Sequence, residues 1–175
     1  MNVQVIGSLL VGLFVPVTAA NADAAGETAS AEIRLANGTS AGTVTLKDMA
    51  AGVLLTFDLK GLSPGAHGFH VHEVGKCDGD FSSAGEIYNP LGAKHGFVND
   101  EGPMAGDLPN IVAGPDGTAR AEMMTTYLHL NRDTDETLFD ADRSALVIYD
   151  KPDDYRTDPE GGSAARIGCG VIKAP

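Results

Sequence analysis

Apolar and polar residues alternate along several stretches of the chain. Ala31, Ile33 and Leu35 alternate with charged residues, and the same period of two recurs over 43–47 and 53–60. Side chains two positions apart on a strand share a face, so each stretch predicts a half-buried β-strand. The same pattern predicts further strands over 119–123, 145–149 and 166–172. No stretch shows a helical period, and Gly- and Pro-containing turns separate the strands.

Two long stretches lack this alternation, about 75–110 and about 150–165, and the first is rich in Gly, Asp, Asn and Pro. Loops of this length inside a compact domain are usually functional or disordered. The chain has no internal repeat and no second compositional block. We therefore predict one all-β domain, an antiparallel sandwich or barrel with two elaborate loops.

The beginning of the chain differs from the rest. Residues 3–17 are mostly apolar, and the small residues Thr18-Ala19-Ala20-Asn21-Ala22 follow them. This pattern predicts a secretory signal peptide over 1–22 and a mature domain over 23–175, although Lys and Arg are missing ahead of the apolar run. A frayed apolar terminus is the alternative. The run is too short to span a membrane, and no second one follows. We expect a secreted or periplasmic protein.

The composition of the chain excludes some classes of binding partner. The chain has 175 residues, 12 of them basic and 24 acidic, for a net charge of −12, and 43% are apolar. The apolar share excludes a wholly disordered chain, and the acidic balance argues against nucleic acid as a partner.

Two cysteines, Cys77 and Cys169, form an even pair. In an exported protein a disulfide between them is the default expectation.

His70 and His72 are the first candidates for chemistry. They occupy positions i and i+2 of a predicted strand, so both imidazoles lie on one face. Two imidazoles on one face can form half of a transition-metal site. A hydrogen-bonded histidine pair without a metal is the alternative, because His-x-His alone is a weak signal.

The stretch 65–73, Gly-Ala-His-Gly-Phe-His-Val-His-Glu, resembles the copper-binding strand of the copper/zinc superoxide dismutase family. Further motifs follow in that family's order: Ser83-Ala84-Gly85, Tyr88-Asn89-Pro90, Lys94-His95-Gly96, Gly106-Asp107-Leu108, Asp153-Asp154, Arg166 and Cys169-Gly170-Val171-Ile172. The resemblance implies an eight-stranded antiparallel Greek-key β-barrel, an immunoglobulin-like sandwich with two long functional loops. It also implies a Cys77–Cys169 disulfide. The long loops are similar to those of the bacterial periplasmic branch.

The resemblance assigns metal ligands and also shows which are replaced. His70 and His72 match copper ligands, and His95 and Asp107 match zinc ligands. Three family histidines are missing: Ile87 stands at the position that bridges both metals, Met104 at a zinc position and Tyr149 at a copper position. An isoleucine has no donor atom, a thioether suits Cu(I) rather than Zn(II), and an ordinary phenol is protonated at neutral pH. A neighbour such as Glu86 or Tyr88 could take the place of the absent bridge.

Other matches concern supporting residues. Asp153 matches an aspartate that hydrogen-bonds one copper and one zinc histidine, here His70 and His95, and His67 matches a structural histidine. Arg166 matches the arginine that attracts superoxide. As an alternative, Arg166 anchors a loop by donating to carbonyls around the disulfide.

Three functional hypotheses follow. We favour an exported dismutase-like protein with incomplete copper and zinc sites: a pseudoenzyme with a binding or structural role, partial copper binding at most, and no tight zinc binding. The second hypothesis is a copper carrier or buffer in which His70, His72 and Met104 hold Cu(I). The third is a superoxide dismutase, converting superoxide to dioxygen and hydrogen peroxide, with an unusual copper site. The partners to consider are superoxide, copper ions, a second copy or another protein.

Overall fold

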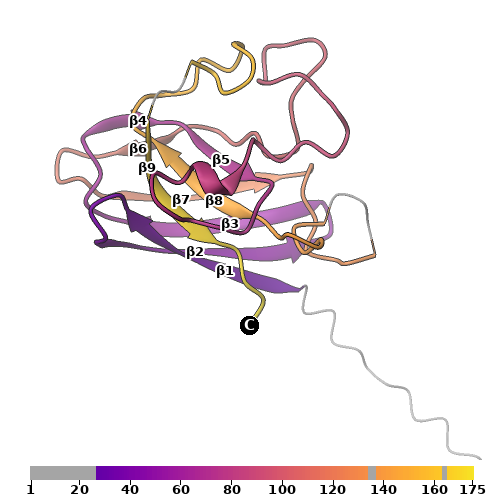
Figure 1. The fold of residues 1–175 in the computed structure, drawn as a ribbon, viewed down its shortest axis with the longest axis horizontal. Helices are drawn as coiled ribbons and strands as arrows, with labels where there is room; N and C mark the ends of the chain where they lie inside the picture. The colour runs from indigo at the N-terminus through magenta and orange to yellow at the C-terminus, as the bar shows by residue number, and fades with distance from the viewer. Residues whose placement is uncertain (1–26, 134–136, 163–164) are drawn as a thin grey trace, which may run out of the picture.

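The computed structural model describes residues 27–133, 137–162 and 165–175 (Figure 1). The predicted signal peptide therefore lies outside the described residues. Within them the chain forms nine strands and one short 3₁₀ helix. The strands are β1 (Thr28–Leu35), β2 (Ser40–Met49), β3 (Gly52–Leu59), β4 (Gly65–His67), β5 (Phe69–His72), β6 (Ile111–Ala113), β7 (Ala119–Thr125), β8 (Ala145–Tyr149) and β9 (Arg166–Val171), and the helix η1 spans Ser82–Ala84.

The strands form a curled antiparallel sheet (Figure 1). Seven strands follow the order β5-β8-β9-β1-β2-β3-β7, and β4 pairs with β6 in a second sheet. Pairs such as β3–β7 and β5–β8 join strands that are distant in sequence, as in a Greek key. Only Gly68 separates β4 from β5, so one expected strand appears as two. The predicted eight-stranded Greek-key fold is confirmed.

The barrel core follows from the alternation. Ile33, Val44 and Leu55 are fully buried on three neighbouring strands, and the rings of Phe57 and Phe69 pack edge to face with centroids 5.8 Å apart. Strand β8 departs from the pattern, because all five of its residues are buried. Its second face must therefore be covered by something other than the barrel core.

The first long loop provides that cover. Ala145, Val147 and Tyr149 of β8 form a second apolar cluster with Phe81 and Cys169, separate from the main core. Phe81 belongs to the loop, just ahead of η1. The outward face of β8 and the neighbouring β5 is thus an interior, enclosed between the sheet and the loop.

The two long loops contact each other. The backbone N–H of His95 donates to the Asp158 carboxylate over 2.8 Å, and the N–H of Val98 donates to the Tyr155 carbonyl over 3.1 Å. Gly96 has a φ of +96°, and a Cβ there would overlap the Tyr155 carbonyl. Glycine is required where the loop backbones approach this closely. The described residues of the two predicted irregular stretches are therefore joined to each other by hydrogen bonds.

Candidate metal centre

The two histidines of the His-x-His motif lie on β5, opposite β8. His70 pairs with Val147 and His72 with Ala145, and both imidazoles are completely buried. The predicted shared face is therefore the enclosed outer face, beneath the long loop. The alternation in the sequence could not predict this burial, because it shows which side chains share a face of a strand but not which segment covers that face.

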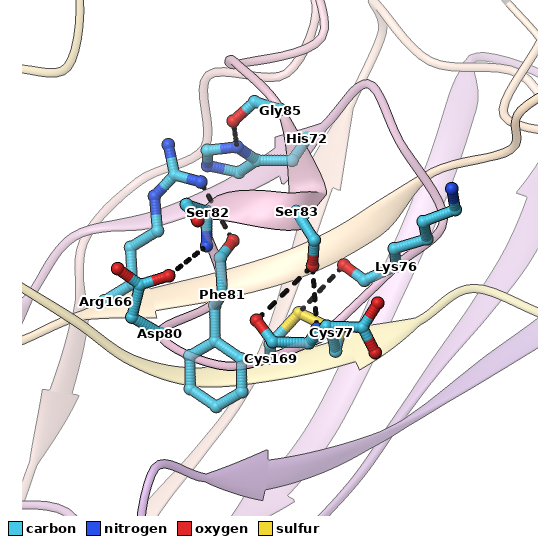
Figure 2. Close-up of a disulfide and its surroundings, with 11 residues drawn as sticks. His72, Lys76, Cys77, Asp80, Phe81, Ser82, Ser83, Gly85, Arg166 and Cys169 are labelled. Carbon is cyan, nitrogen blue, oxygen red and sulfur yellow. Dashed lines mark hydrogen bonds between the residues drawn. A yellow bond between two sulfur atoms is a disulfide. The ribbon is translucent and has the colours of Figure 1, made fainter.

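Both ring nitrogens of His72 have hydrogen-bond partners. Its Nδ1 lies 3.0 Å from the carbonyl oxygen of Gly85 (Figure 2). Because a carbonyl only accepts, Nδ1 must carry the proton. Nε2 then offers its lone pair, and the Tyr149 hydroxyl lies 3.1 Å away as the donor. The lone pair of His72 Nε2, which a metal ion would need, therefore accepts the hydrogen bond from the Tyr149 hydroxyl.

Burial keeps these groups neutral. It lowers the pKa of His70 to about 4, although Asp153 and Asp107 oppose the shift. It also lowers the pKa of His72 to about 3, and the Arg166 charge adds to this effect. Burial raises the pKa of the Tyr149 phenol above its ordinary value. A neutral phenol is a poor metal ligand.

A second cluster joins His95 to two carboxylates. Its Nε2 lies 3.0 Å from Asp153 Oδ1, and its Nδ1 lies 2.8 Å from Asp107 Oδ1. Burial alone would lower the pKa of His95, but its contacts with Asp107 and Asp153 raise it to about 10. At neutral pH His95 is therefore an imidazolium between two carboxylates.

The expected bridge by Asp153 is only half formed. Asp153 hydrogen-bonds His95, as predicted, but its other oxygen lies 3.6 Å from Nε2 of His70. Nδ1 of His70 is 3.8 Å from Asp107, and neither nitrogen of His70 has a hydrogen-bond partner among the described residues. These separations exceed hydrogen-bonding distance.

Further residues hold the two carboxylates in place. Asn110 exchanges two hydrogen bonds with the backbone of Asp153, and the N–H of Tyr155 donates to the Asp153 carboxylate. The second oxygen of Asp107 accepts from the N–H groups of Gly96 and Met104. Sequence reasoning missed Asn110 and Tyr155, because they lie in irregular segments where no periodicity marks their orientation.

Two of the three positions that the resemblance assigns to missing histidines border a cavity. Ile87 is buried beside His72, and with the half-buried Met104 it lines a cavity of about 220 Å³. Of the two suggested replacement ligands, Tyr88 donates its hydroxyl to the Thr137 carbonyl, and Glu86 is exposed and lines the same cavity. Across residues 27–133, 137–162 and 165–175, no three or more His, Cys, Asp or Glu side chains are disposed to hold a metal ion.

Arg166 lies at the loop interface. One nitrogen donates to the Phe81 carbonyl over 3.0 Å, and another lies 2.7 Å from the Glu160 carboxylate (Figure 2 shows Arg166 beside Phe81). Its guanidinium carbon is 5.9 Å from the centre of the Tyr149 ring. The geometry has the form of the predicted loop anchor. The Glu160 partner was missed, because nothing in its surrounding sequence distinguishes it from other loop carboxylates.

Two supporting features lie where they were predicted. Cys77 and Cys169 form a disulfide with their Cα atoms 5.7 Å apart, which confirms the expected bond. His67 is buried, with Nδ1 at 2.7 Å from the Tyr149 carbonyl and Nε2 at 2.8 Å from the Ser63 carbonyl. His67 therefore ties the end of β8 to the turn before β4. No helix in the described part of the chain has the length and apolar character needed to cross a membrane.

The fold and the clustered histidines define a dismutase-like Greek-key barrel, and comparisons with known proteins give the family. Residues 40–172 match the family model of copper/zinc superoxide dismutase. A copper/zinc superoxide dismutase of Caulobacter vibrioides is 43% identical over 148 residues, covering 83% of this chain and 85% of that protein. The chain therefore belongs to the copper/zinc superoxide dismutase family.

A subgroup of relatives carries a different name. The superoxide dismutase-like protein YojM of Bacillus subtilis is 40% identical over 138 residues, covering 77% of this chain and 70% of that protein. The crystal structure of a SOD-like protein from Bacillus subtilis superposes with a TM-score of 0.79 at 37% identity, covering 81% of this chain and 96% of that one. The chain is thus similar both to enzymes of the family and to a protein described as dismutase-like.

The buried imidazoles predict a maximum in stability near pH 6.5 for metal-free protein. Below that pH the unfolded chain protonates His70 and His72 while the folded chain keeps them neutral until about pH 4 and 3. Stability therefore falls as the pH drops, by about 3 kcal/mol per pH unit for two protons. His95 has the opposite effect on stability. Its contribution to the free energy of unfolding is complete below pH 6.5 and is lost as the pH rises through about 10.

Urea unfolding of chelator-treated protein between pH 4 and pH 10 measures this profile. The alkaline slope should flatten in a His95→Gln variant, and the acid slope should remain. A wild-type stability that keeps rising from pH 6.5 to pH 9 would contradict the assignment.

Proposed function

We propose that this chain is an exported dismutase-like protein with incomplete copper and zinc sites, which is not an efficient dismutase and serves as a binding or structural protein. The observation that carries the proposal is the hydrogen bond from the Tyr149 hydroxyl to Nε2 of His72. It replaces a metal with a neutral donor at one of the two remaining copper positions.

The lost donors support this function. Dismutation requires one metal to cycle between two oxidation states in a fixed geometry, and ligand type and geometry set that capacity. His70 and His72 leave copper with two of its four family ligands, and Ile87 removes the residue that both metals would share. At most, His70 permits weak partial copper binding. Two zinc-side residues, His95 and Asp107, are too few for tight zinc binding.

The retained residues support a structural role. His67, Asp153 and Arg166 each join separate segments of the chain through contacts among protein groups alone. The disulfide supports export, because such bonds persist in oxidising compartments. The substitutions thus fall on positions that serve chiefly as ligands, while positions with a second role in the fold keep their residues.

Elemental analysis and a superoxide dismutation assay on the same copper- and zinc-loaded sample test the proposal. We expect well below one copper per chain after removal of loose metal, and turnover far below the diffusion-limited range of efficient enzymes. Competition against a Cu(I) chelator measures the affinity of the protein for Cu(I). A copper carrier would show measurable affinity without dismutase turnover, which distinguishes it from the proposed protein. Stoichiometric copper with fast turnover, lost in a His70→Ala, His72→Ala double variant, would establish an unusual dismutase and refute the proposal.

A further inference from the structure

A groove of about 380 Å³ lies beside the disulfide, and both cysteines line it. Its other lining residues are Ser30, Glu32 and Arg34 of β1, Phe81 of the loop, and Gly170, Val171 and Lys173 at the end of the chain. The three β1 residues are exposed and alternate with buried ones, so they share the outward face of the strand. The volume falls within the range of small-molecule sites.

The two sulfur atoms differ in access. Cys169 is 1% exposed and belongs to the apolar cluster beneath the loop, whereas Cys77 is partly exposed. Figure 2 shows Cys77 on the loop side of the bond and Cys169 on strand β9. Attack on a disulfide requires that a thiolate reach one sulfur, so Cys77 is the accessible target.

Charged side chains surround the bond. Arg34 is the direct cross-strand partner of Cys169, and directly opposed residues project from the same face of a sheet. Lys173 supplies a second cation, and Glu32, which lies 2.8 Å from Arg34, supplies the one carboxylate among the lining residues. A nearby cation stabilises a thiolate, both as it approaches and as it leaves.

We propose that this groove binds a small anionic thiol of the glutathione type, which exchanges with the disulfide at Cys77. The carboxylates of such a thiol match Arg34 and Lys173, and its ammonium group matches Glu32. The thiolate forms a bond to the sulfur of Cys77 while the Cys77–Cys169 bond breaks. Cys169 leaves as a thiolate that takes a proton from water, and Cys77 becomes a mixed disulfide with the thiol.

The test is exchange between the oxidised full chain and reduced glutathione, quenched with acid and mapped by mass spectrometry. We expect the adduct on Cys77. An Arg34→Ala, Lys173→Ala double variant should react roughly fivefold more slowly with glutathione, an effect typical of exposed charge pairs. The same variant should react with 2-mercaptoethanol, a neutral thiol, at the wild-type rate.

Arg120 provides the matched control. It is an exposed arginine on β7, paired with Asp58 and absent from the groove lining. Arg120→Ala should leave both rates unchanged, and high salt should reduce the wild-type preference for glutathione. An adduct on Cys169, no adduct at all, or an equal loss of rate with both thiols would overturn the proposal. None of these readouts depends on metal content or dismutase activity.

Discussion

Replacing Ile87, Met104 and Tyr149 together with histidine is expected to produce a protein that binds copper and zinc and dismutes superoxide. The three changes place imidazole donors at the positions that the family resemblance assigns to metal ligands. Changes in groups that merely support metal ligands alter affinity or activity by roughly 10- to 100-fold. Returning three ligands should therefore raise turnover by on the order of a hundredfold or more.

Partial variants identify which residue limits the site. Ile87→His with Met104→His should recover zinc affinity but little copper, because the Tyr149 hydroxyl still occupies Nε2 of His72. Adding Tyr149→His should then raise both the copper content and the dismutase turnover of the variant. Metal content by elemental analysis and turnover by assay follow each step. A fully active double variant would show that Tyr149 does not obstruct copper.

Removing the disulfide is expected to produce the largest loss of stability. The bond closes a loop of 92 residues, for which chain-entropy arguments give roughly 4–5 kcal/mol and measured losses in small secreted domains are about 2–5 kcal/mol. A Cys77→Ala, Cys169→Ala double variant should therefore unfold at a much lower urea concentration. The loop that carries Phe81 would also lose its covalent attachment to β9, which weakens the Arg166 anchor.

Urea titration of the wild type, the double variant and the reduced wild type makes the comparison. The reduced protein and the variant should have similar midpoints, because both lack the covalent link, and the variant loses only the two sulfur atoms in addition. A variant as stable as the oxidised protein would mean that the loop is held by its noncovalent contacts alone.

Most of the strand architecture could be predicted from the sequence. The alternation around Ile33 and over 53–60 marks half-buried strands directly, because one face of each packs in the core. The short strand β6 was not predicted, since three residues are too few to show a period. The Cys77–Cys169 bond was expected from the even number of cysteines in an exported protein, and the family resemblance implied it as well. The Greek-key connections followed from the resemblance rather than from periodicity.

The sequence predicted which residues form the candidate metal centre, but not how their side chains are arranged. The motifs named His70, His72, His95 and Asp107. In the structure Asp107 lies 2.8 Å from His95 and 3.8 Å from His70, whereas His72 contacts Tyr149 and Gly85. The Tyr149–His72 hydrogen bond could not be predicted, because a substitution at a ligand position does not reveal where the new side chain points. The pairing of Glu160 with Arg166 was equally hidden, since it depends on the path of an irregular loop.

That pairing has a consequence for how charged molecules approach this end of the barrel. The guanidinium is tied to Glu160 and to a backbone carbonyl, while Glu73, Glu86 and Glu160 border the adjacent cavity. Because the chain carries a net charge of −12, we expect a negative potential at the cavity entrance. Such a potential would repel small anions and concentrate cations, a long-range preference opposite in sign to the one that would guide superoxide inward.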